Sequence, residues 1–451
     1  MSNTLPISKD SLPPRPPSHP EITRAWKRSP EASPPSRKRP RVDESTDSHE
    51  QPLSSNTMSS LPPKSIASPI MFPVQPLHRF QGASATIKRP REIAHFSYDH
   101  NHEYREDDSG INYYCRPQLG SDLRTGFDTF KHYEDVEDPH LDSLLKTIIS
   151  KEKREGVKVD TDFVTWRGMM TKIMTAPFDM FAAFDMRATL HDGTIYIEED
   201  FAAKVADRAA EANEPQSNRN SNPHQASREM MTYWGYKFEA LALLPDTPQN
   251  TPMSVIEQRP SLVVSNHAQH CSIVKTAFGS NSLVIGGEVD GLWQPKPQDP
   301  NAPVPWIELK TSEELPQHPQ KRDILRFERK LLKFWAQSFL LGVEKIIVGF
   351  RSKQGILRAV EVYDTAWIPG RVRRGTACWD GNTCINFAAS FLTHLKQTIT
   401  DEGVYKITLR KKGGTIEVGK VEDKGTGGIL SDEFLEWRNR KQEAAEVEKF
   451  E

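Results

Sequence analysis

Four charged residues in two short segments have types and spacing that could do chemistry. Glu288 and Asp290 are two residues apart, and so are Glu308 and Lys310. Side chains of a β-strand alternate between faces, so each pair is predicted to share one face. Mg²⁺ or Mn²⁺ takes oxygen ligands from carboxylates and phosphates, and a nearby lysine can orient water and neutralise developing charge. The pattern predicts three carboxylates and one lysine around a metal-bound phosphate.

A plainer reading of the same residues is an exposed strand with a Glu–Lys pair, which is common in sheets and carries no chemistry. Glu-x-Lys alone also arises by chance in chains of this length. The context favours chemistry, because the apolar residues Val284 and Ile285 precede the first acids and Leu292 follows them. Asp290 with Glu308-x-Lys310 resembles the D…(D/E)-x-K pattern of the restriction-nuclease-like superfamily.

Further segments resemble one family within that superfamily. They are 88–98 (KRPREIAHFSY), 163–168 (FVTWRG), 230–239 (MMTYWGYKFE) and 333–337 (KFWAQ). Together with the acidic segments they resemble the DXO/RAI family of RNA 5′-end decapping nucleases, from about Pro73 to the C-terminus. The resemblance implies a metal-dependent RNA 5′ hydrolase with Mg²⁺ or Mn²⁺ as its cofactor.

The resemblance also implies roles for individual residues. Glu239, Asp290 and Glu308 would be metal ligands together with the backbone carbonyl of Leu309, and Glu288 would serve a second ion or a metal-bound water. Lys310 and Gln337 would contact the attacking water and the scissile phosphate. The planar fork of Arg167 suits phosphate oxygens, with a structural ion pair as the alternative. Without the family motif, Glu239 would be taken for an ordinary exposed helix acid.

Members of this family act on RNA 5′ ends that lack a finished cap. They remove pyrophosphate from 5′-triphosphate ends or cap nucleotides from incompletely methylated ends, and some remove NAD caps or degrade RNA. The chain most resembles the fungal nuclear branch, which implies a heterodimer with, and stimulation of, the nuclear 5′-3′ exoribonuclease. The alternatives are a noncatalytic scaffold for that exoribonuclease and a DNA-directed restriction-like nuclease.

Composition separates an N-terminal tail from a folded part. The chain has 451 residues, of which 36% are hydrophobic and 27% charged, with a net charge of −2. Residues 1–73 are rich in Pro, Ser and charge without helical or strand periodicity, so we expect a disordered tail. Its basic cluster Arg37–Arg41 predicts nuclear import, the alternative being a solvated charge run. No apolar run is long enough to span a bilayer and four scattered cysteines give no zinc pattern, so we expect a soluble intracellular protein without a membrane partner.

For residues 74–451 we predict one compact α/β (α+β) domain, in which helices flank a large mixed β-sheet and a smaller sheet around a restriction-nuclease-like (D/E)xK core. Polar insertions are predicted near 210–225 and 294–303. Since only the second insertion separates the two acidic strands, we expect those strands to be neighbours in one sheet. Helices are predicted at 227–244, at 323–341 and from 431, and strands at 345–351, 356–363, 404–409 and 415–421.

Overall fold

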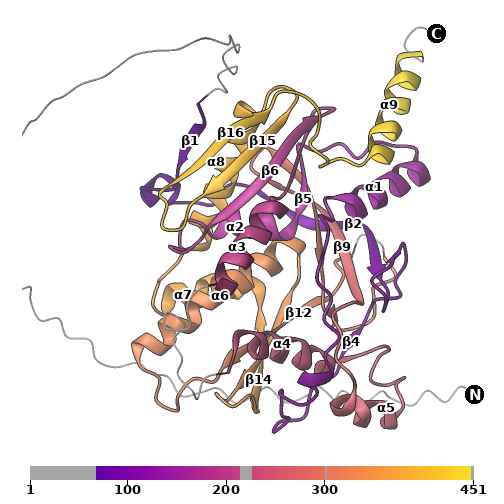
Figure 1. Ribbon diagram of the computed structural model, residues 1–451. Helices are drawn as coiled ribbons and strands as arrows, with labels where there is room; N and C mark the ends of the chain where they lie inside the picture. Colours follow the sequence, from indigo (N-terminus) through magenta and orange to yellow (C-terminus); the bar gives the residue numbers. More distant parts are fainter. Residues whose placement is uncertain (1–67, 214–225, 300–301, 448–451) are drawn as a thin grey trace, which may run out of the picture. The chain divides into compact units, whose positions relative to one another are not determined.

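The computed structural model describes residues 68–213, 226–299 and 302–447 (Figure 1). The chain divides into two units, Met1–Pro63 and Lys64–Glu451, and every described residue belongs to the second. The predicted tail, including its basic cluster, therefore lies outside the described residues up to position 67. Its last part differs from the prediction, because Ile70–Pro73 form a strand that pairs with Thr415–Val418 and buries Phe72. The folded part thus begins before Pro73.

The described strands form one large sheet and one smaller sheet. In spatial order, the ten strands of the large sheet are β1 (Ile70–Pro73), β16 (Thr415–Glu422), β15 (Val404–Leu409), β6 (Phe184–His191), β7 (Thr194–Glu199), β5 (Phe163–Trp166), β10 (Asn281–Glu288), β9 (Gln269–Phe278), β2 (Ile87–Tyr98) and β3 (Tyr104–Arg105). The six strands of the smaller sheet are β14 (Leu357–Asp364), β13 (Lys345–Arg351), β12 (Trp306–Glu313), β11 (Gly291–Leu292), β4 (Tyr113–Tyr114) and β8 (Leu243–Leu244).

Helices complete the described fold. The α-helices are α1 (Asp142–Glu155), α2 (Arg167–Thr175), α3 (Phe201–Asn213), α4 (Arg228–Ala242), α5 (Met253–Gln258), α6 (Lys321–Leu341), α7 (Ile368–Arg374), α8 (Gly381–Thr398) and α9 (Asp432–Val447). Short 3₁₀ turns are η1 (Leu77–Phe80), η2 (Phe127–Thr129), η3 (Arg259–Ser261) and η4 (Thr365–Trp367). Among the described helices, none is long and apolar enough to cross a membrane.

Three apolar clusters fix the order of the layers. Helices α2, α6 and α8 share one cluster with inward-facing residues of both sheets, such as Ile285 of β10 and Val348 of β13. Helices α1 and α9 cover the opposite face of the large sheet, where they pack near Val284. Helix α4 covers the opposite face of the smaller sheet, against Ile307 and Leu309. The predicted fold class, a large mixed sheet and a smaller sheet flanked by helices, is confirmed.

Local signals explain why α4, which carries Glu239, and α6, which carries Gln337, form where they do. The Ser227 side chain accepts a hydrogen bond from the Met230 amide at 3.1 Å and so caps the start of α4. At the C-terminal end of α6, Gly342 adopts a left-handed conformation with φ of 73°, which a glycine reaches at little cost. Both boundaries agree with the sequence prediction to within two residues.

One prediction about the sheets was wrong. The two acidic segments are not neighbouring strands of one sheet, because β10 ends at Glu288 in the large sheet whereas β12 belongs to the smaller one. The chain crosses between the sheets at Val289 and Asp290, and the two-residue strand β11 then pairs with β12 through Gly291 and Leu292. Asp290 therefore lies in a link rather than on a strand face.

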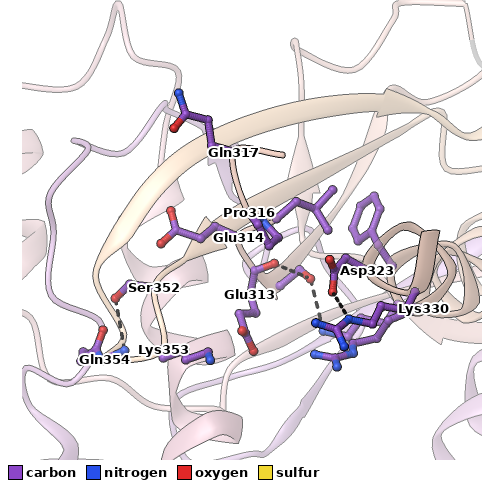
Figure 2. A pocket seen from close by; sticks show the side chains of 14 residues that line it. Glu313, Glu314, Pro316, Gln317, Asp323, Lys330, Ser352, Lys353 and Gln354 are labelled. Atoms are coloured by element: carbon purple, nitrogen blue, oxygen red, sulfur yellow. Dashed lines mark hydrogen bonds and ion pairs between the residues drawn. The ribbon is translucent and has the colours of Figure 1, made fainter. Parts of the chain in front are cut away.

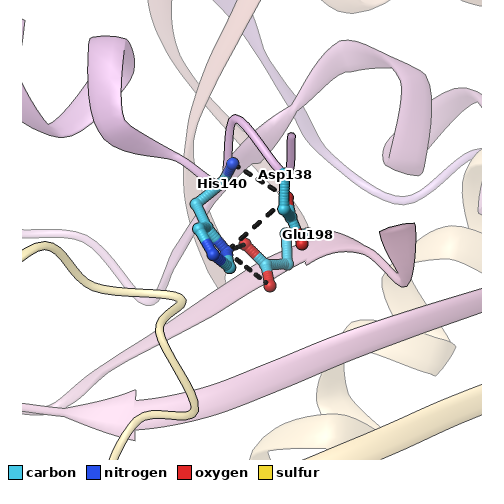
Figure 3. A group of neighbouring side chains, drawn as sticks. All are labelled: Asp138, His140 and Glu198. Atoms are coloured by element: carbon cyan, nitrogen blue, oxygen red, sulfur yellow. Dashed lines mark hydrogen bonds and ion pairs between the residues drawn. The ribbon is translucent and has the colours of Figure 1, made fainter. Parts of the chain in front are cut away.

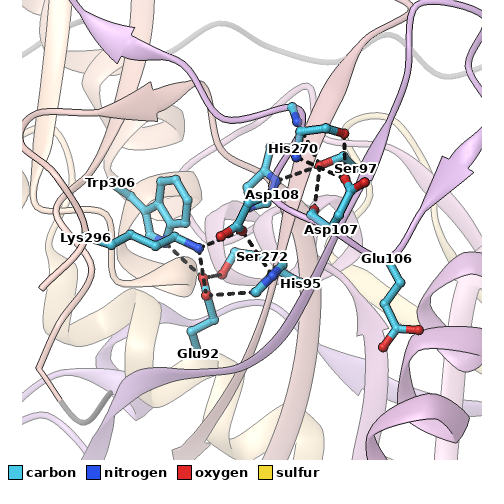
Figure 4. A network of polar contacts seen from close by, with 12 residues as sticks. Glu92, His95, Ser97, Glu106, Asp107, Asp108, His270, Ser272, Lys296 and Trp306 are labelled. Atoms are coloured by element: carbon cyan, nitrogen blue, oxygen red, sulfur yellow. Dashed lines mark hydrogen bonds and ion pairs between the residues drawn. The ribbon is translucent and has the colours of Figure 1, made fainter. Parts of the chain in front are cut away.

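The two predicted insertions are described only in part. Residues 210–213 continue α3, while 214–225 lie outside the described residues. In the second insertion, Lys296 is 2.9 Å from Asp108 and 3.9 Å from Glu92 (Figure 4). Glu92 in turn accepts hydrogen bonds from Trp306 Nε1 at 3.1 Å and Ser272 Oγ at 2.6 Å. This network ties the insertion and the first residue of β12 to the large sheet.

Candidate nuclease active site

Glu308, on β12, is the best-connected carboxylate of the predicted site. Its side chain is 1% exposed, and Lys310 Nζ lies 2.5 Å from one of its oxygens. Arg167 Nη1 lies 3.1 Å from the other oxygen and also donates to the backbone carbonyl of Glu288 at 3.0 Å. The predicted pair Glu308 and Lys310 does share a strand face, and Arg167 joins it to the end of β10.

Arg167 reaches this position because β5 leads directly into α2. Strand β5 ends at Trp166 and runs parallel to β10, so the first residue of α2 emerges beside the last residues of β10. Gly287 allows the close approach, since a Cβ atom there would lie only 2.8 Å from the Cβ of Arg167. The ion pair that was the alternative for Arg167 is present, and its partner is itself a predicted metal ligand.

Asp290 contacts β12 through the backbone. Its Oδ2 accepts a hydrogen bond from the Leu309 amide at 2.5 Å. Strand β11 pairs with β12 only at Trp306 and Ile307, so it leaves this edge of Leu309 without a strand partner. Because the N–H and C=O of one strand residue point to the same side, the Leu309 carbonyl is also directed toward the side of Asp290. This geometry suits the predicted role of that carbonyl as a ligand.

Glu239 comes to the same place from α4. The helix packs on β12 through Phe238, and Gly349 of β13 makes room for that ring, because a Cβ atom there would lie 2.5 Å from it. Burial, followed by the negative charges of Asp290 and Glu288, raises the pKa of Glu239 well above its ordinary value. Glu239 is therefore within electrostatic reach of the acids on β10, the link and β12.

The acidic side chains of this site outnumber its cationic side chains. Burial raises the pKa of Asp290 to about 7, with Glu308 adding to the effect. Burial also raises the pKa of Glu288. Burial opposes ionisation of Glu308 as well, but Lys310 and Arg167 outweigh it and lower its pKa. Four carboxylates against two cations leave an excess of negative charge that a divalent cation would offset, and hard oxygen donors are the ligands Mg²⁺ and Mn²⁺ prefer.

Gln337 is placed less directly. It is half-buried on α6, and its side chain has no hydrogen bond to the four acids within the described part of the chain. Leu341 lies one turn further on the same stripe, and a Cβ atom on Gly287 would be 3.0 Å from its methyl group. This stripe of α6 thus faces the end of β10, which puts Gln337 beside the site rather than in the cluster.

A second group of possible ligands was not anticipated from the sequence. Asp138, His140 and Glu198 offer donor atoms that all lie within 4.8 Å of one another (Figure 3). His140 Nδ1 is 3.0 Å from Glu198 Oε2, and Arg187 lies 3.9 Å from the other Glu198 oxygen. Burial raises the pKa of Glu198 to about 7. Because His140 Nδ1 and Arg187 already occupy the Glu198 carboxyl, the group is explained as a polar network between a loop and the large sheet.

The fold and the first of these sites define a class: a metal-dependent nuclease in which a (D/E)-x-K strand and a preceding acid lie at the junction of two sheets. The chain belongs to the family of RAI1-like PD-(D/E)XK nucleases, which it matches over residues 88–435.

Relatives and solved structures agree with this assignment. The chain is 49% identical over 374 residues to the decapping nuclease RAI1 of Aspergillus fumigatus, and the match covers 82% of this chain and 98% of the relative. It is similar to the crystal structure of Candida albicans Rai1 in complex with pU5 and Mn²⁺, with a TM-score of 0.74 and 28% identity. That match covers 83% of this chain and 100% of the Candida albicans chain. Scheffersomyces stipitis Rai1 in complex with (3′-NADP)⁺ and a calcium ion gives a TM-score of 0.72, 28% identity and coverage of 79% and 98%.

Proposed function

We propose that this protein is a metal-dependent decapping nuclease that acts on RNA 5′ ends lacking a finished cap. The observation that carries the proposal is the buried group in which Glu308 contacts both Lys310 and Arg167 while Asp290 is held against Leu309. A decapping nuclease name on a relative that is 49% identical, and an RNA ligand together with Mn²⁺ in a similar structure, support RNA as the substrate.

The residues that would hold the metal are Glu239, Asp290, Glu308 and the Leu309 carbonyl, with Glu288 acting through a second ion or a water. A bound Mg²⁺ or Mn²⁺ supplies charge neutralisation on phosphate and a lower pKa of water. The site residues were predicted from the sequence, and their roles remain part of this proposal.

The cations have separate tasks in this proposal. The Lys310 ammonium, fixed by Glu308 at 2.5 Å, orients the attacking water and stabilises charge that develops on the phosphate. The Arg167 guanidinium uses one nitrogen for Glu308 and Glu288, so its remaining N–H groups can donate to phosphate oxygens. Gln337, on the stripe of α6 that faces β10, contacts the scissile phosphate or the water.

The finer substrate assignment includes three kinds of 5′ end. Hydrolysis at this site would release pyrophosphate from 5′-triphosphate RNA, cap nucleotides from incompletely methylated RNA, and the NAD moiety from NAD-capped RNA. A dinucleotide ligand in the similar Scheffersomyces stipitis structure supports the last of these. We further propose that the protein acts in the nucleus, directed there by the basic cluster Arg37–Arg41, and that it binds and stimulates a nuclear 5′-3′ exoribonuclease.

The test compares the purified protein with an Asp290→Ala, Glu308→Ala double variant. Substrates are single-stranded RNAs with 5′-triphosphate, unmethylated-cap, methylated-cap, NAD-capped and 5′-monophosphate ends, with duplex DNA of the same sequence as the control. We expect Mn²⁺-dependent release from the unfinished ends, loss with EDTA, and loss in the double variant. Cleavage of duplex DNA in preference to RNA would replace the proposal with a DNA-directed nuclease.

A scaffold without catalysis makes a different prediction. If the protein only stabilised the exoribonuclease, the double variant would promote decay of 5′-triphosphate RNA as well as the wild type does. We expect both versions to bind the exoribonuclease and to promote decay of 5′-monophosphate RNA, while only the wild type promotes decay of 5′-triphosphate RNA. The proposed nuclear import signal is tested by neutralising the basic residues of Arg37–Arg41, which should reduce nuclear accumulation of the protein.

A further inference from the structure

Glu92, on β2 of the large sheet, is bonded directly to the strand that carries Glu308 (Figure 4). Its Oε2 accepts a hydrogen bond from Ser272 Oγ of β9 at 2.6 Å and another from Trp306 Nε1 of β12 at 3.1 Å. Both ends of the second bond are shielded from water, since the Glu92 side chain is 16% exposed and Trp306 is 3% exposed. One carboxylate oxygen therefore joins the two sheets close to the acids of the site.

The two donors of these hydrogen bonds lie next to the strand positions that carry two of the acids. Ser272 follows Cys271, which pairs with Glu288 in the antiparallel register of β9 and β10. Trp306 precedes Glu308 by two residues on β12, or roughly 7 Å of strand. A change in the distance between the two donors would therefore also change the distance between Glu288 and Glu308.

The second oxygen of Glu92 faces a histidine and a lysine. His95 Nδ1 lies 3.4 Å from Oε1, and Lys296 Nζ, from the insertion at 294–303, lies 3.9 Å from it. Lys296 Nζ also lies 5.4 Å from the centre of the Trp306 ring. Burial opposes ionisation of Glu92, but its contacts with these neighbours outweigh burial and lower its pKa. An ionised carboxylate only accepts hydrogen bonds, so Glu92 is held in the form that suits both donors.

The acids on the two sides of the junction repel each other. Burial raises the pKa of Glu288, and the negative charge of Glu308 adds to that effect. Arg167 bridges the two segments at Glu308 itself, whereas Glu92 holds the start of β12. The bond from Glu92 therefore resists, from outside the acidic group, the widening of the junction that this repulsion favours.

We propose that Glu92 is a positioning residue: through Trp306 it sets the distance of β12 from the end of β10, and with it the affinity of the carboxylates for Mn²⁺. The inference rests on the proposed function, because it concerns the same metal site. Glu92 is not one of the proposed ligands and acts through the position of β12. Lys296 supports this role by favouring the ionised form of Glu92, which gives the insertion a part in metal binding.

The experiment measures Mn²⁺ binding by the full-length protein without RNA, from the signal of free Mn²⁺ in electron paramagnetic resonance. Glu92→Ala removes both hydrogen bonds, and Trp306→Phe removes only the bond that crosses the junction. Glu92→Gln keeps a side-chain oxygen that can accept from both donors. Rates on 5′-triphosphate RNA are then measured as a function of Mn²⁺ and of RNA, and the Tm is measured for every variant.

Two control variants separate positioning from a loss of stability. Ser312→Ala removes the hydrogen bond from Lys330 Nζ, at 3.2 Å, which joins the other end of β12 to α6 rather than to the large sheet (Figure 2). Asn281→Ala removes the side-chain hydrogen bonds of a residue that is 2% exposed. Asn281 is at the opposite end of β10 from Glu288, so its loss should lower the Tm without moving β12.

Glu92→Ala and Trp306→Phe should each raise the Kd of Mn²⁺ by about 3- to 10-fold, less than the roughly 10- to 100-fold typical of residues that contact a metal ligand directly. Because both changes remove the same bond, the double variant should lose no more than the weaker single variant. Glu92→Gln should restore the affinity to within about twofold of the wild type, and both controls should match the wild type. The KM for RNA at saturating Mn²⁺ should change by less than about twofold, because the bond does not contact RNA.

Three results would overturn the positioning role. They are an unchanged Kd of Mn²⁺ in Trp306→Phe, an equal loss in either control, and a loss in Glu92→Gln as large as in Glu92→Ala. If Glu92→Ala does not fold, Trp306→Phe and Glu92→Gln decide the question.

The two proposals fail separately, since Mn²⁺ binding is measured without hydrolysis. A wild type that binds Mn²⁺ more tightly than Trp306→Phe but hydrolyses no RNA 5′ end would retain the positioning role and reject the decapping function. A wild type that hydrolyses RNA ends with the same Mn²⁺ dependence as Trp306→Phe would retain the function and reject the positioning role.

Discussion

Replacing one proposed metal ligand should stabilise the metal-free protein while it abolishes activity. Asp290 sits among acids, and its pKa is raised from 3.8 to about 7. A carboxyl with a raised pKa in the folded state costs stability as the pH rises from its unfolded value to its folded value, and the full cost is present above pH 7. A shift of about 3 units corresponds to an upper limit of about 4 kcal/mol.

Asp290→Asn removes this charge and keeps an oxygen for the Leu309 amide, which lies 2.5 Å from the carboxylate. Part of the gain is lost because Lys310 also loses a favourable charge. We therefore expect a free energy of unfolding that is higher by about 1–3 kcal/mol at pH 8 in EDTA. Hydrolysis of RNA 5′ ends should fall to background, because a metal ligand has been removed.

The assay is urea unfolding of the wild type and the variant at pH 8, with and without Mn²⁺. Asp128→Asn, at an exposed position, is the control and should change stability by less than about 0.5 kcal/mol. Mn²⁺ at 100 times its Kd should stabilise the wild type by about 2.7 kcal/mol and the variant by less. The difference in free energy of unfolding between the two proteins should therefore shrink or change sign when Mn²⁺ is added. If the variant is less stable than the wild type in EDTA, the excess negative charge of this acidic group does not destabilise the metal-free protein, and the reasoning is refuted.

Three further changes test the supports of the site. Gly349→Ala would force a Cβ to 2.5 Å from Phe238, so it should destabilise the protein by about 1–3 kcal/mol and lower activity by shifting α4, as measured by unfolding and initial rates. Arg259→Met should cost about 3 kcal/mol and also lower kcat, because Arg259 donates to the Leu241 carbonyl at the end of α4 at 2.5 Å; unchanged stability would contradict this. Burial lowers the pKa of His270 from 6.5 to about 4, so stability should fall by about 2 kcal/mol between pH 7 and pH 5, and His270→Gln should lose most of that dependence in pH-resolved unfolding.

Much of the fold could be predicted from local patterns. Apolar spacing and end signals gave α4 after Ser227 and α6 before Gly342, and runs of apolar residues gave β13, β14, β15 and β16. These elements are set by short-range effects, namely capping, strand alternation and glycine conformation, which neighbouring residues control. The insertion at 294–303 was visible as composition, although its anchorage through Lys296 was not.

The sequence by itself determined which residues could do the chemistry, since carboxylates and a lysine at a spacing of two are a property of the chain. Tertiary structure alone decided how they meet. Asp290 lies in a link between two sheets rather than on a strand, and Arg167, 141 residues before Glu308, forms an ion pair with it. Such contacts depend on how β5, β10 and β12 pack, and that packing is decided by the burial of the shared apolar core, which no local pattern of residues encodes.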